Sequence, residues 1–330
     1  MVRIEHITAA ADIERLSTEW KALWQRVPNA TPFQSPEWLI SWWECFGNST
    51  RVVLTARDGQ DLVAVLPLYR LEERGFCKLL PIGISLSDYL DAVVCPNYPG
   101  LAETLLAALV DLPGWHECYI PDLPPLAAML AAQCPRELEE EVGAGETCPI
   151  LALPDAVEAL STVIPRKTLR DLRQARRRAA AVGTAGVMRA TAATLAEFMK
   201  EFFRLHESRW TPIVGHGVCA DPVVREFHLA AAGRMIEAGM LRLYLLRIGT
   251  AAIAAYYGFL AKGIAFAYLS AFDPDRADLS PGTQIVGHAI EEAVREGACE
   301  FHFLRGGEAY KYAWGAVDRW NTTRILRRKC

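Results

Sequence analysis

The order of helical and strand-like segments between residues 194 and 328 constrains the fold of this chain more than any other feature of its sequence. Apolar residues recur at helical spacing in some segments and form short strand-like runs in others. The segments are helix, helix, strand, strand, strand, helix, strand, short helix and strand, at residues 194–210, 221–238, 241–248, 251–260, 263–271, 283–295, 299–304, 308–314 and 323–328. This order predicts an α/β fold in which a mixed sheet is flanked by helices.

The first half of the chain also mixes strands with helices. Ser35-Pro36-Glu37 is typical of a helix start, with a hydroxyl cap, a proline in the first turn and an acid beside it. Asp58-Gly59 predicts a hairpin between strands at 51–56 and 62–71. Residues 154–165 contain two prolines and look like a connection. We therefore expect two domains, 1–154 and 155–330.

Composition excludes several classes of protein. A chain of 330 residues that is 52% apolar and 22% charged has ample material for a globular core. Its nine cysteines form no Cys-x-x-Cys pair, which favours reduced thiols over a disulfide framework or a metal site. No early apolar core indicates a secretory signal, and no run reaches the roughly 18 apolar residues of a membrane span. We therefore expect a cytoplasmic protein.

A strongly basic segment stands out against the net charge of −4. The helical pattern over 165–182 carries seven cations between Arg166 and Arg178 and a single acid, Asp171. One reading is a solvated helix face. The other is a surface for the phosphates of a coenzyme, a nucleotide sugar or tRNA, because so many like charges repel one another unless an anion lies nearby.

The stretch FHFLRGGEAYKYAWG, residues 301–315, predicts a strand, a break at the two glycines and a short helix. Ligands of open α/β sheets bind where strands end. Arg305 and Lys311 follow the strand, so this turn suits an anionic ligand, although an ordinary solvated turn accounts for it equally well. Similarly, Asp88 and Tyr89 could line a cleft or simply form a turn.

Several segments together carry a resemblance to a known family. They are FQSPEWLISWW, SDYLD, RKTLRDLRQARRRAAAVG, FFRLHESRW and the series YLSAFDP, LSPG and FHFLRGGEAYKYAWG. In this order the chain resembles the CelD/BcsL family of GNAT-type acetyltransferases, which is related to the FemAB peptidyltransferases. The resemblance implies two GNAT-like halves. It also implies transfer of an acyl group from acyl-CoA to an amine or hydroxyl of a polysaccharide or cell-envelope precursor, without a metal.

The resemblance further places the pyrophosphate of the coenzyme at residues 279–283, where Ser280, Gly282 and Thr283 would bind it. The usual closely spaced glycines are missing there, because Gly282 stands alone. This departure leaves two alternatives open. One is a FemAB-like transferase with an aminoacyl-tRNA donor. The other is a non-catalytic GNAT-like accessory protein of exopolysaccharide or cellulose synthesis.

The resemblance also implies that two neighbouring strands move apart near 269–272 and 303–305, and it implies roles for individual side chains around this opening. Asp273 or His206 would act as the base and Tyr268 as the acid, while Arg209 and Trp210 would contact the acceptor. Arg305 and Lys311 would bind phosphate or steady the oxyanion, and Glu308 would orient an amine. The helix dipole explains His206 and Arg209 equally well, because both lie near a predicted helix C-terminus.

Overall fold

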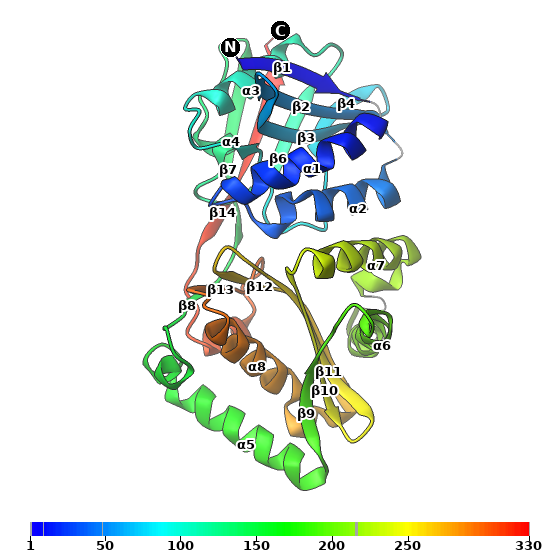
Figure 1. Cartoon of the computed structure of the whole chain (residues 1–330), viewed down its shortest axis with the longest axis vertical. Coiled ribbons are helices and arrows are strands. Elements are labelled where there is room, and N and C mark those ends of the chain that lie inside the picture. Colours follow the sequence, from blue (N-terminus) through cyan, green and yellow to red (C-terminus); the bar gives the residue numbers. More distant parts are fainter. Residues whose placement is uncertain (1, 9, 48, 215–216, 330) are drawn as a thin grey trace. The chain divides into compact units, whose positions relative to one another are not determined.

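The chain forms two separate β-sheets, each flanked by helices, as the computed structural model in Figure 1 shows. The structure describes residues 2–8, 10–47, 49–214 and 217–329. Residues 1–147 together with 320–330 form the first unit, and residues 148–319 form the second. Both sheets are mixed, since each combines antiparallel hairpins with one parallel pair. The predicted α/β class is confirmed.

The two units differ from the predicted domains, which met at 154/155, mainly because the last strand belongs to the first unit. β14 (Trp320–Arg328) lies in the first sheet, between β6 (Glu117–Leu123) and β7 (Leu138–Thr147), and pairs antiparallel with both. The prediction had placed it in a domain spanning 155–330. Pairing between strands so distant in the sequence leaves no local pattern, so the apolar periodicity could show the strand but not its sheet.

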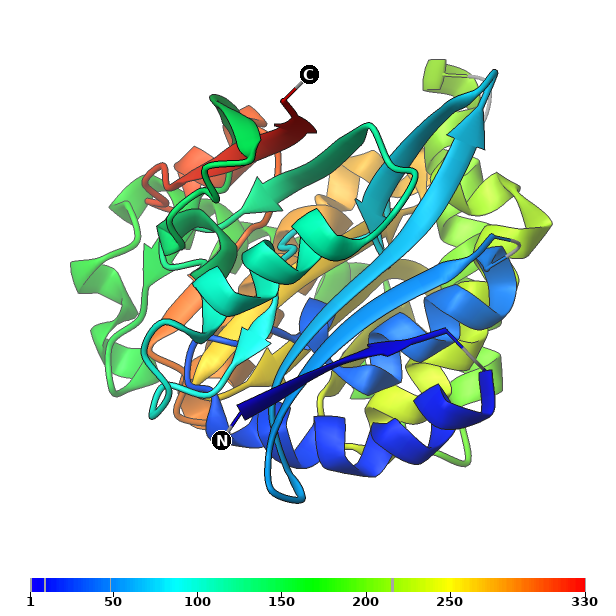
Figure 2. The ribbon, with the colours of Figure 1, turned by 90° about the horizontal axis from the view of Figure 1, so that it is seen from above.

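The first unit is a sheet with helices on its two faces (Figure 2). Its strand order is β1-β2-β3-β4-β6-β14-β7, and β5 pairs with β3. Its remaining elements are β1 (Val2–Ile7), α1 (Ala10–Arg26), η1 (Pro32–Gln34), α2 (Pro36–Phe46), β2 (Arg51–Asp58), β3 (Asp61–Glu73), β4 (Phe76–Pro81), β5 (Val93–Val94), α3 (Leu101–Asp111) and α4 (Ala128–Ala131).

Local sequence explains how α2 begins. The Ser35 hydroxyl accepts a hydrogen bond from the Trp38 N–H at 3.3 Å, and Pro36 occupies the first helical position. The buried face of the helix then packs its tryptophans into the core of the first unit, where Trp38 is fully buried. The cap and the aromatic face were both expected from the sequence.

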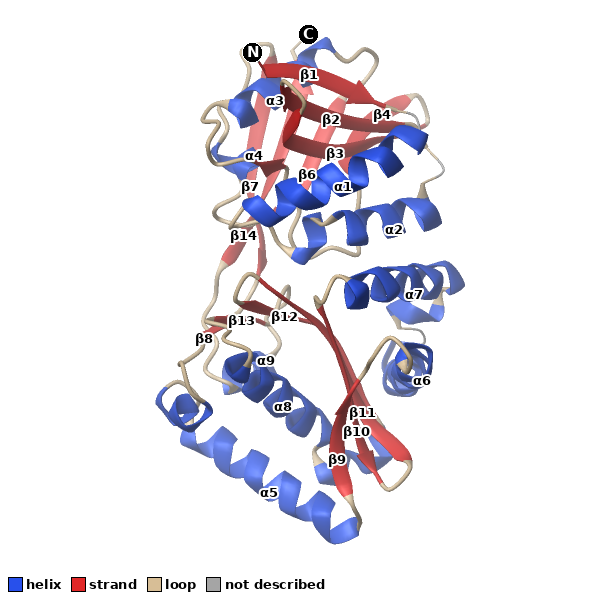
Figure 3. Ribbon diagram, viewed as in Figure 1, coloured by secondary structure: helices blue, strands red, loops and turns tan. Residues whose placement is uncertain are grey.

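The second unit has strand order β8-β13-β12-β11-β10-β9. In Figure 3, the short helix α9 lies beside α8. The elements are β8 (Ile150–Ala152), η2 (Val157–Thr162), α5 (Arg166–Val182), β9 (Ala185–Arg189), α6 (Leu195–Val214), η3 (Val218–Ala220), α7 (Pro222–Glu237), β10 (Leu241–Ile248), β11 (Ala251–Ala261), β12 (Ile264–Phe272), η4 (Pro274–Leu279), α8 (Pro281–Arg295), β13 (Glu300–His302) and α9 (Ala309–Ala313).

Helices cover both faces of this second sheet. α5 and α8 lie on one side of it, and α6 and α7 lie on the other (Figure 1). Ile285 and Ile290 of α8 are fully buried in the core that this helix forms with the sheet. Gly287 lets α5 and α9 approach α8 closely, because a Cβ atom there would lie 2.8 Å from Leu172 and 3.1 Å from Trp314.

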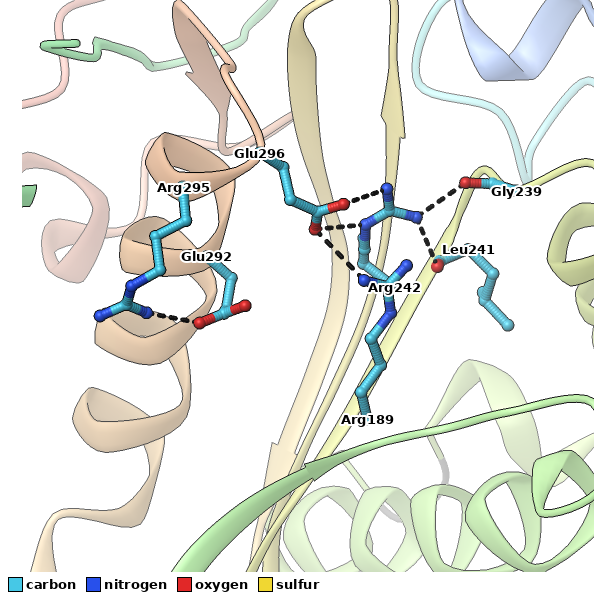
Figure 4. Close-up of polar contacts among 7 residues, drawn as sticks. All are labelled: Arg189, Gly239, Leu241, Arg242, Glu292, Arg295 and Glu296. Carbon is cyan, nitrogen blue, oxygen red and sulfur yellow. Dashed lines mark hydrogen bonds and ion pairs between the residues drawn. The ribbon is translucent and has the colours of Figure 1, made fainter. Parts of the chain in front are cut away.

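A polar network fastens the C-terminal end of α8 to the sheet (Figure 4). The Glu296 carboxylate accepts hydrogen bonds of 2.7 and 2.6 Å from the Arg242 guanidinium, and Arg189 approaches it at 3.5 Å. Arg242 also donates to two backbone carbonyls, those of Gly239 and Leu241. Only 11% of the Arg242 side chain is exposed, so this pair is largely withdrawn from water.

We expect Glu296→Gln to lower the free energy of unfolding by about 2 kcal/mol, because a charge-assisted pair to a buried guanidinium is lost while the side-chain shape is kept. The matched control is Glu292→Gln. Glu292 lies on the same helix and pairs with the half-exposed Arg295 (Figure 4), so its replacement should cost at most about 0.5 kcal/mol. Urea unfolding of the three proteins measures the difference, and equal losses would contradict the assignment.

The described ranges contain neither a membrane-spanning helix nor a cluster of metal ligands. None of the helices there is both long and apolar enough to cross a membrane. No group of three or more His, Cys, Asp or Glu side chains in those ranges could hold a metal ion.

Candidate functional site

The parallel pair β12–β13 opens at one end of the second sheet. Three residue pairs hold the strands together, and the last joins Phe266 to His302. β12 then continues to Phe272, whereas the Phe303 N–H donates to the Pro149 carbonyl at 2.9 Å. From residue 267 onward, the described chain pairs β12 only with β11. This opening involves the same residues, 269–272 and 303–305, that the resemblance implied.

The N-terminus of α8 faces the same region. Ser280, with φ of 50°, ends the preceding turn, and Pro281 begins the helix. No side chain caps this end, so the first-turn N–H groups of Gly282 and Thr283 are available to an anion. Arg178 of α5 steadies the turn through bonds to the Asp278 carbonyl and to the Ser280 hydroxyl at 3.0 and 3.1 Å.

A pocket of about 360 Å³ lies between these elements. Residues from β12, α5, α6, α8 and α9 line it: Lys167, Thr168, Asp171, Arg209, Ser270, Phe272, Gly282, Thr283, Val286, Tyr310, Ala313 and Trp314. The Thr168 hydroxyl donates to the Ala313 carbonyl and joins the α5 wall to the α9 wall. The pocket therefore combines cations, helix N–H groups and an aromatic floor.

Three of the sequence-predicted residues meet in this pocket. Arg209, Gly282 and Thr283 all line it, and Ser280 lies directly before the helix that forms one wall. The sequence reasoning missed Lys167, Thr168 and Asp171, although it had singled out their basic helix as a phosphate-binding surface. It could not place α5 against α8 and α9, because only the folded chain brings them together.

Arg209 is held in the pocket wall by one hydrogen bond and two aromatic rings. Its Nη1 donates to the Ser270 carbonyl at 3.0 Å, and its guanidinium carbon lies 4.6 Å from the ring centre of Phe272 and 5.2 Å from that of Trp210. Burial lowers the pKa of Arg209. Trp210, the other predicted acceptor contact, thus packs against Arg209 and does not itself line the pocket.

Tyr310 is a pocket residue that the sequence reasoning also missed. Its ring meets Phe303 edge-on at 6.2 Å, and it remains 43% exposed. Desolvation at the hydroxyl and the nearby Glu308 carboxylate raise the pKa of Tyr310 to about 12, so the phenol keeps its proton at neutral pH. The only signal for it in the sequence is its place in the glycine–helix stretch, between Glu308 and Lys311.

Lys311 supports the loop beside the pocket. Its ammonium is almost fully buried and donates to the carbonyls of Leu304, Arg305 and Gly306 at 3.0, 2.6 and 2.9 Å. It also pairs with Glu308 at 2.8 Å. With three donors on the amine and four acceptors around it, this group holds the turn of the chain. Neither Lys311 nor Arg305 lines the pocket.

The remaining candidates of the second unit lie outside the pocket lining. The Asp273 carboxylate caps η4 by accepting the Asp275 N–H at 3.0 Å. Tyr268 packs among aromatic rings, 5.6 Å from Tyr257. His206 is 2% exposed, and burial, followed by the charge of Arg209, lowers its pKa to about 4. His206 is therefore neutral at pH 7.

Asp88 and Tyr89 belong to the first unit and are buried there. Only 8% of Asp88 and 3% of Tyr89 are exposed. The Asp88 carbonyl accepts a hydrogen bond from Asn321 of β14 at 3.1 Å, and the Tyr89 ring packs edge-on against Phe33. Both side chains are therefore part of the core of the first unit.

Comparisons with known proteins agree with this geometry. Residues 166–312 match a family model described as an acetyltransferase (GNAT) domain. FemX shares 12% identity and a TM-score of 0.67 over 98% of this chain and 96% of its own. L-PGS from Bacillus licheniformis shares 12% identity and a TM-score of 0.54 over 89% and 92% of the two chains.

A tandem GNAT protein from the clavulanic acid biosynthesis pathway is 14% identical, with a TM-score of 0.50 over 98% of both chains. No curated protein matches the sequence. The predicted tandem GNAT-like fold is confirmed, whereas membership of the CelD/BcsL family stays a prediction. The chain therefore has a tandem GNAT-like fold, and residues 166–312 of its second unit match the acetyltransferase (GNAT) domain model.

Proposed function

We propose that this protein is an acyltransferase whose second unit takes an acyl group from acyl-CoA and passes it to an amine or hydroxyl of a polysaccharide or cell-envelope precursor. One observation carries the proposal. The uncapped N-terminus of α8 opens into a pocket that also contains Lys167 and lies against the unpaired half of β12. Helix N–H groups and a lysine suit phosphates, and open strand N–H groups suit a carbonyl oxygen.

In this proposal, different walls of the pocket have different tasks. Gly282 and Thr283 would hold phosphates through their backbone N–H groups, with Lys167 supplying a positive charge. The open edge of β12 would polarise the thioester carbonyl. These are the donor-binding roles predicted from the sequence, with Lys167 added and Arg305 moved to the supporting loop.

The transfer itself needs one bond to form and one to break. The acceptor nitrogen or oxygen attacks the thioester carbon, the carbon–sulfur bond breaks, and the leaving thiolate takes a proton. Tyr310 is the pocket residue that can supply this proton, because its phenol is protonated at neutral pH. The acceptor proton leaves to water or to a carboxylate, and Asp171 is a carboxylate that lines the pocket.

Thermal unfolding with acetyl-CoA tests the proposal. Ligand at about 100 times its dissociation constant should stabilise the protein by roughly 2.7 kcal/mol, which means a shift of a few degrees. Desulfo-CoA should reproduce the shift and adenosine should not. Lys167→Ala should weaken binding, while Arg173→Ala, an exposed cation of the same helix outside the pocket, should not.

No shift with acetyl-, succinyl- or longer acyl-CoA would overturn the proposed donor. A second candidate would then apply, in which the donor is an aminoacyl-tRNA. The observation that favours it is a row of exposed arginines along α5, spaced by four, three and four residues and so on one helix face: Arg166, Arg170, Arg173 and Arg177. The apolar side of α5 is packed in the core, so a bound tRNA would contact this helix through the charges of its arginines.

Binding of charged tRNA at several salt concentrations tests this second candidate. If four phosphates are contacted, log K should fall with log salt with a slope of about −3. Replacing the four arginines with glutamine should flatten that slope. Salt-independent or undetectable binding would exclude a tRNA donor, and with no acyl-CoA binding either, a non-catalytic role would be favoured.

A further inference from the structure

Arg209 differs from three other arginines of the second unit that are shielded from water. Arg242, Arg247 and Arg225 have side chains that are 11%, 19% and 34% exposed, and each pairs with a carboxylate at 2.6 to 2.9 Å. Arg209 is also half-buried, yet no carboxylate of the described residues lies within ion-pair distance of it. A guanidinium in this position has lost part of its hydration, and the Glu308 carboxylate acts on it only from beyond ion-pair distance.

The donors of Arg209 are also mostly unused. A guanidinium has five N–H groups, and among the described residues Arg209 makes one hydrogen bond, to the Ser270 carbonyl at 3.0 Å. The guanidinium carbon also lies over the rings of Phe272 and Trp210, at 4.6 and 5.2 Å from their centres. Two rings and one hydrogen bond therefore hold the guanidinium, and Arg209 is one of the residues that line the pocket.

The planar guanidinium presents its N–H donors in a fixed geometry that matches only certain acceptor groups. Carboxylate and phosphate oxygens accept two parallel hydrogen bonds from one guanidinium, and a neutral hydroxyl or amide cannot. Arg209 lies on α6, whereas the helix N-terminus that suits the donor phosphates lies on α8. The two anion-binding features of the pocket therefore come from different walls.

We propose that Arg209 recognises a carboxylate or phosphate group on the substrate itself, so that this transferase selects an anionic acyl group or an anionic acceptor. The inference rests on the proposed acyltransferase function and narrows its substrate class. It changes the role predicted from the sequence, because Arg209 selects by charge and geometry and does not merely line the acceptor path.

Two matched pairs of probes separate the sources of the anionic group. Succinyl-CoA and butyryl-CoA have acyl chains of equal length, and only the first ends in a carboxylate. Glucosamine 6-phosphate and glucosamine differ only in a phosphate. We expect the wild-type protein to bind the anionic member of at least one pair tenfold or more tightly, measured by calorimetry at fixed ionic strength. The pair that shows this preference tells whether donor or acceptor carries the group.

Variants of the protein test whether Arg209 causes the preference for the anionic probe. Arg209→Gln should reduce it to less than twofold, and Lys200→Gln, which removes an exposed cation of the same helix outside the pocket, should leave it unchanged. If Arg209→Gln fails to fold, Arg209→Lys replaces it as the test. The lysine keeps the positive charge over Phe272 but not the paired donors, so the preference for the anionic probe should fall at least threefold.

Three results would overturn the inference. They are no preference in either pair, a preference that Arg209→Gln or Arg209→Lys leaves unchanged, and an equal loss of butyryl- and succinyl-CoA binding in the variants, which would assign Arg209 to the coenzyme. If the wild-type protein binds no acyl-CoA at all, the proposed donor fails, and the glucosamine pair still tests Arg209 separately.

Discussion

Gly282→Asp should weaken acyl-CoA binding at least a hundredfold while leaving the second unit folded. Gly282 lies in the first turn of α8, and its φ is not positive, so an L residue fits the backbone. An aspartate there would occupy the helix N-terminus with its own carboxylate. At about 4 Å and an effective dielectric constant near 20, its repulsion of a phosphate is about 4 kcal/mol, more than the 2.7 kcal/mol of a hundredfold change.

Stability and binding should separate in this variant, because an acid in the first turn of a helix stabilises it by about 0.3–1 kcal/mol. Calorimetric titration with acetyl-CoA and a melting curve without ligand measure the two effects. Gly282→Ala is the matched control, since its Cβ meets Phe272 at the same 3.2 Å but adds no charge, and it should lose less than tenfold. Equal losses in both variants would show that space, not charge, matters at α8.

Arg324→Met should destabilise the first unit by about 3 kcal/mol. Arg324 lies on β14 opposite Ile120 of β6 and Val142 of β7, and 1% of it is exposed. It donates to the Met129 carbonyl and pairs with Glu140 at 2.7 Å. Removing one member of a buried pair costs about 3–5 kcal/mol, and the partial exposure of Glu140 places the loss at the lower end.

Hydrogen exchange of the β6 and β7 amides measures this loss in the first unit alone. Arg327→Met is the control on the same strand. Arg327 is 42% exposed and pairs with Glu117 and Glu141 at 2.9 Å, so its replacement should cost less than about 1 kcal/mol. A change of the same size at both positions would mean that burial does not distinguish the two arginines.

The sequence predicted features that depend on neighbouring residues. The start of α2 at Ser35-Pro36, the hairpin at Asp58-Gly59 and the strand–turn–helix of 301–315 all have local causes, namely a cap, a two-residue turn and a change of periodicity. The apolar residues between 123 and 133 predict a longer helix than the structure has, since only Ala128–Ala131 is helical there.

The features that sequence could not show depend on tertiary contacts. Lys311 looked like a free cation for a ligand, but the turn of its own loop surrounds the ammonium with carbonyls. Such burial of a lysine is rare and has no periodic signal. Tyr310 and Lys167 line the pocket because α9 and α5 meet beside α8, and their positions in the sequence are far apart.

The place of β14 has a consequence for the order in which the chain is completed during translation. β7 pairs only with β14 among the described strands, so the edge of the first sheet stays open until residues 320–328 have left the ribosome. At about 5–20 residues per second, synthesis of residues 148–319 alone takes about 10 to 35 s. The first unit is therefore the last of the two to finish folding, after the unit that contains the pocket.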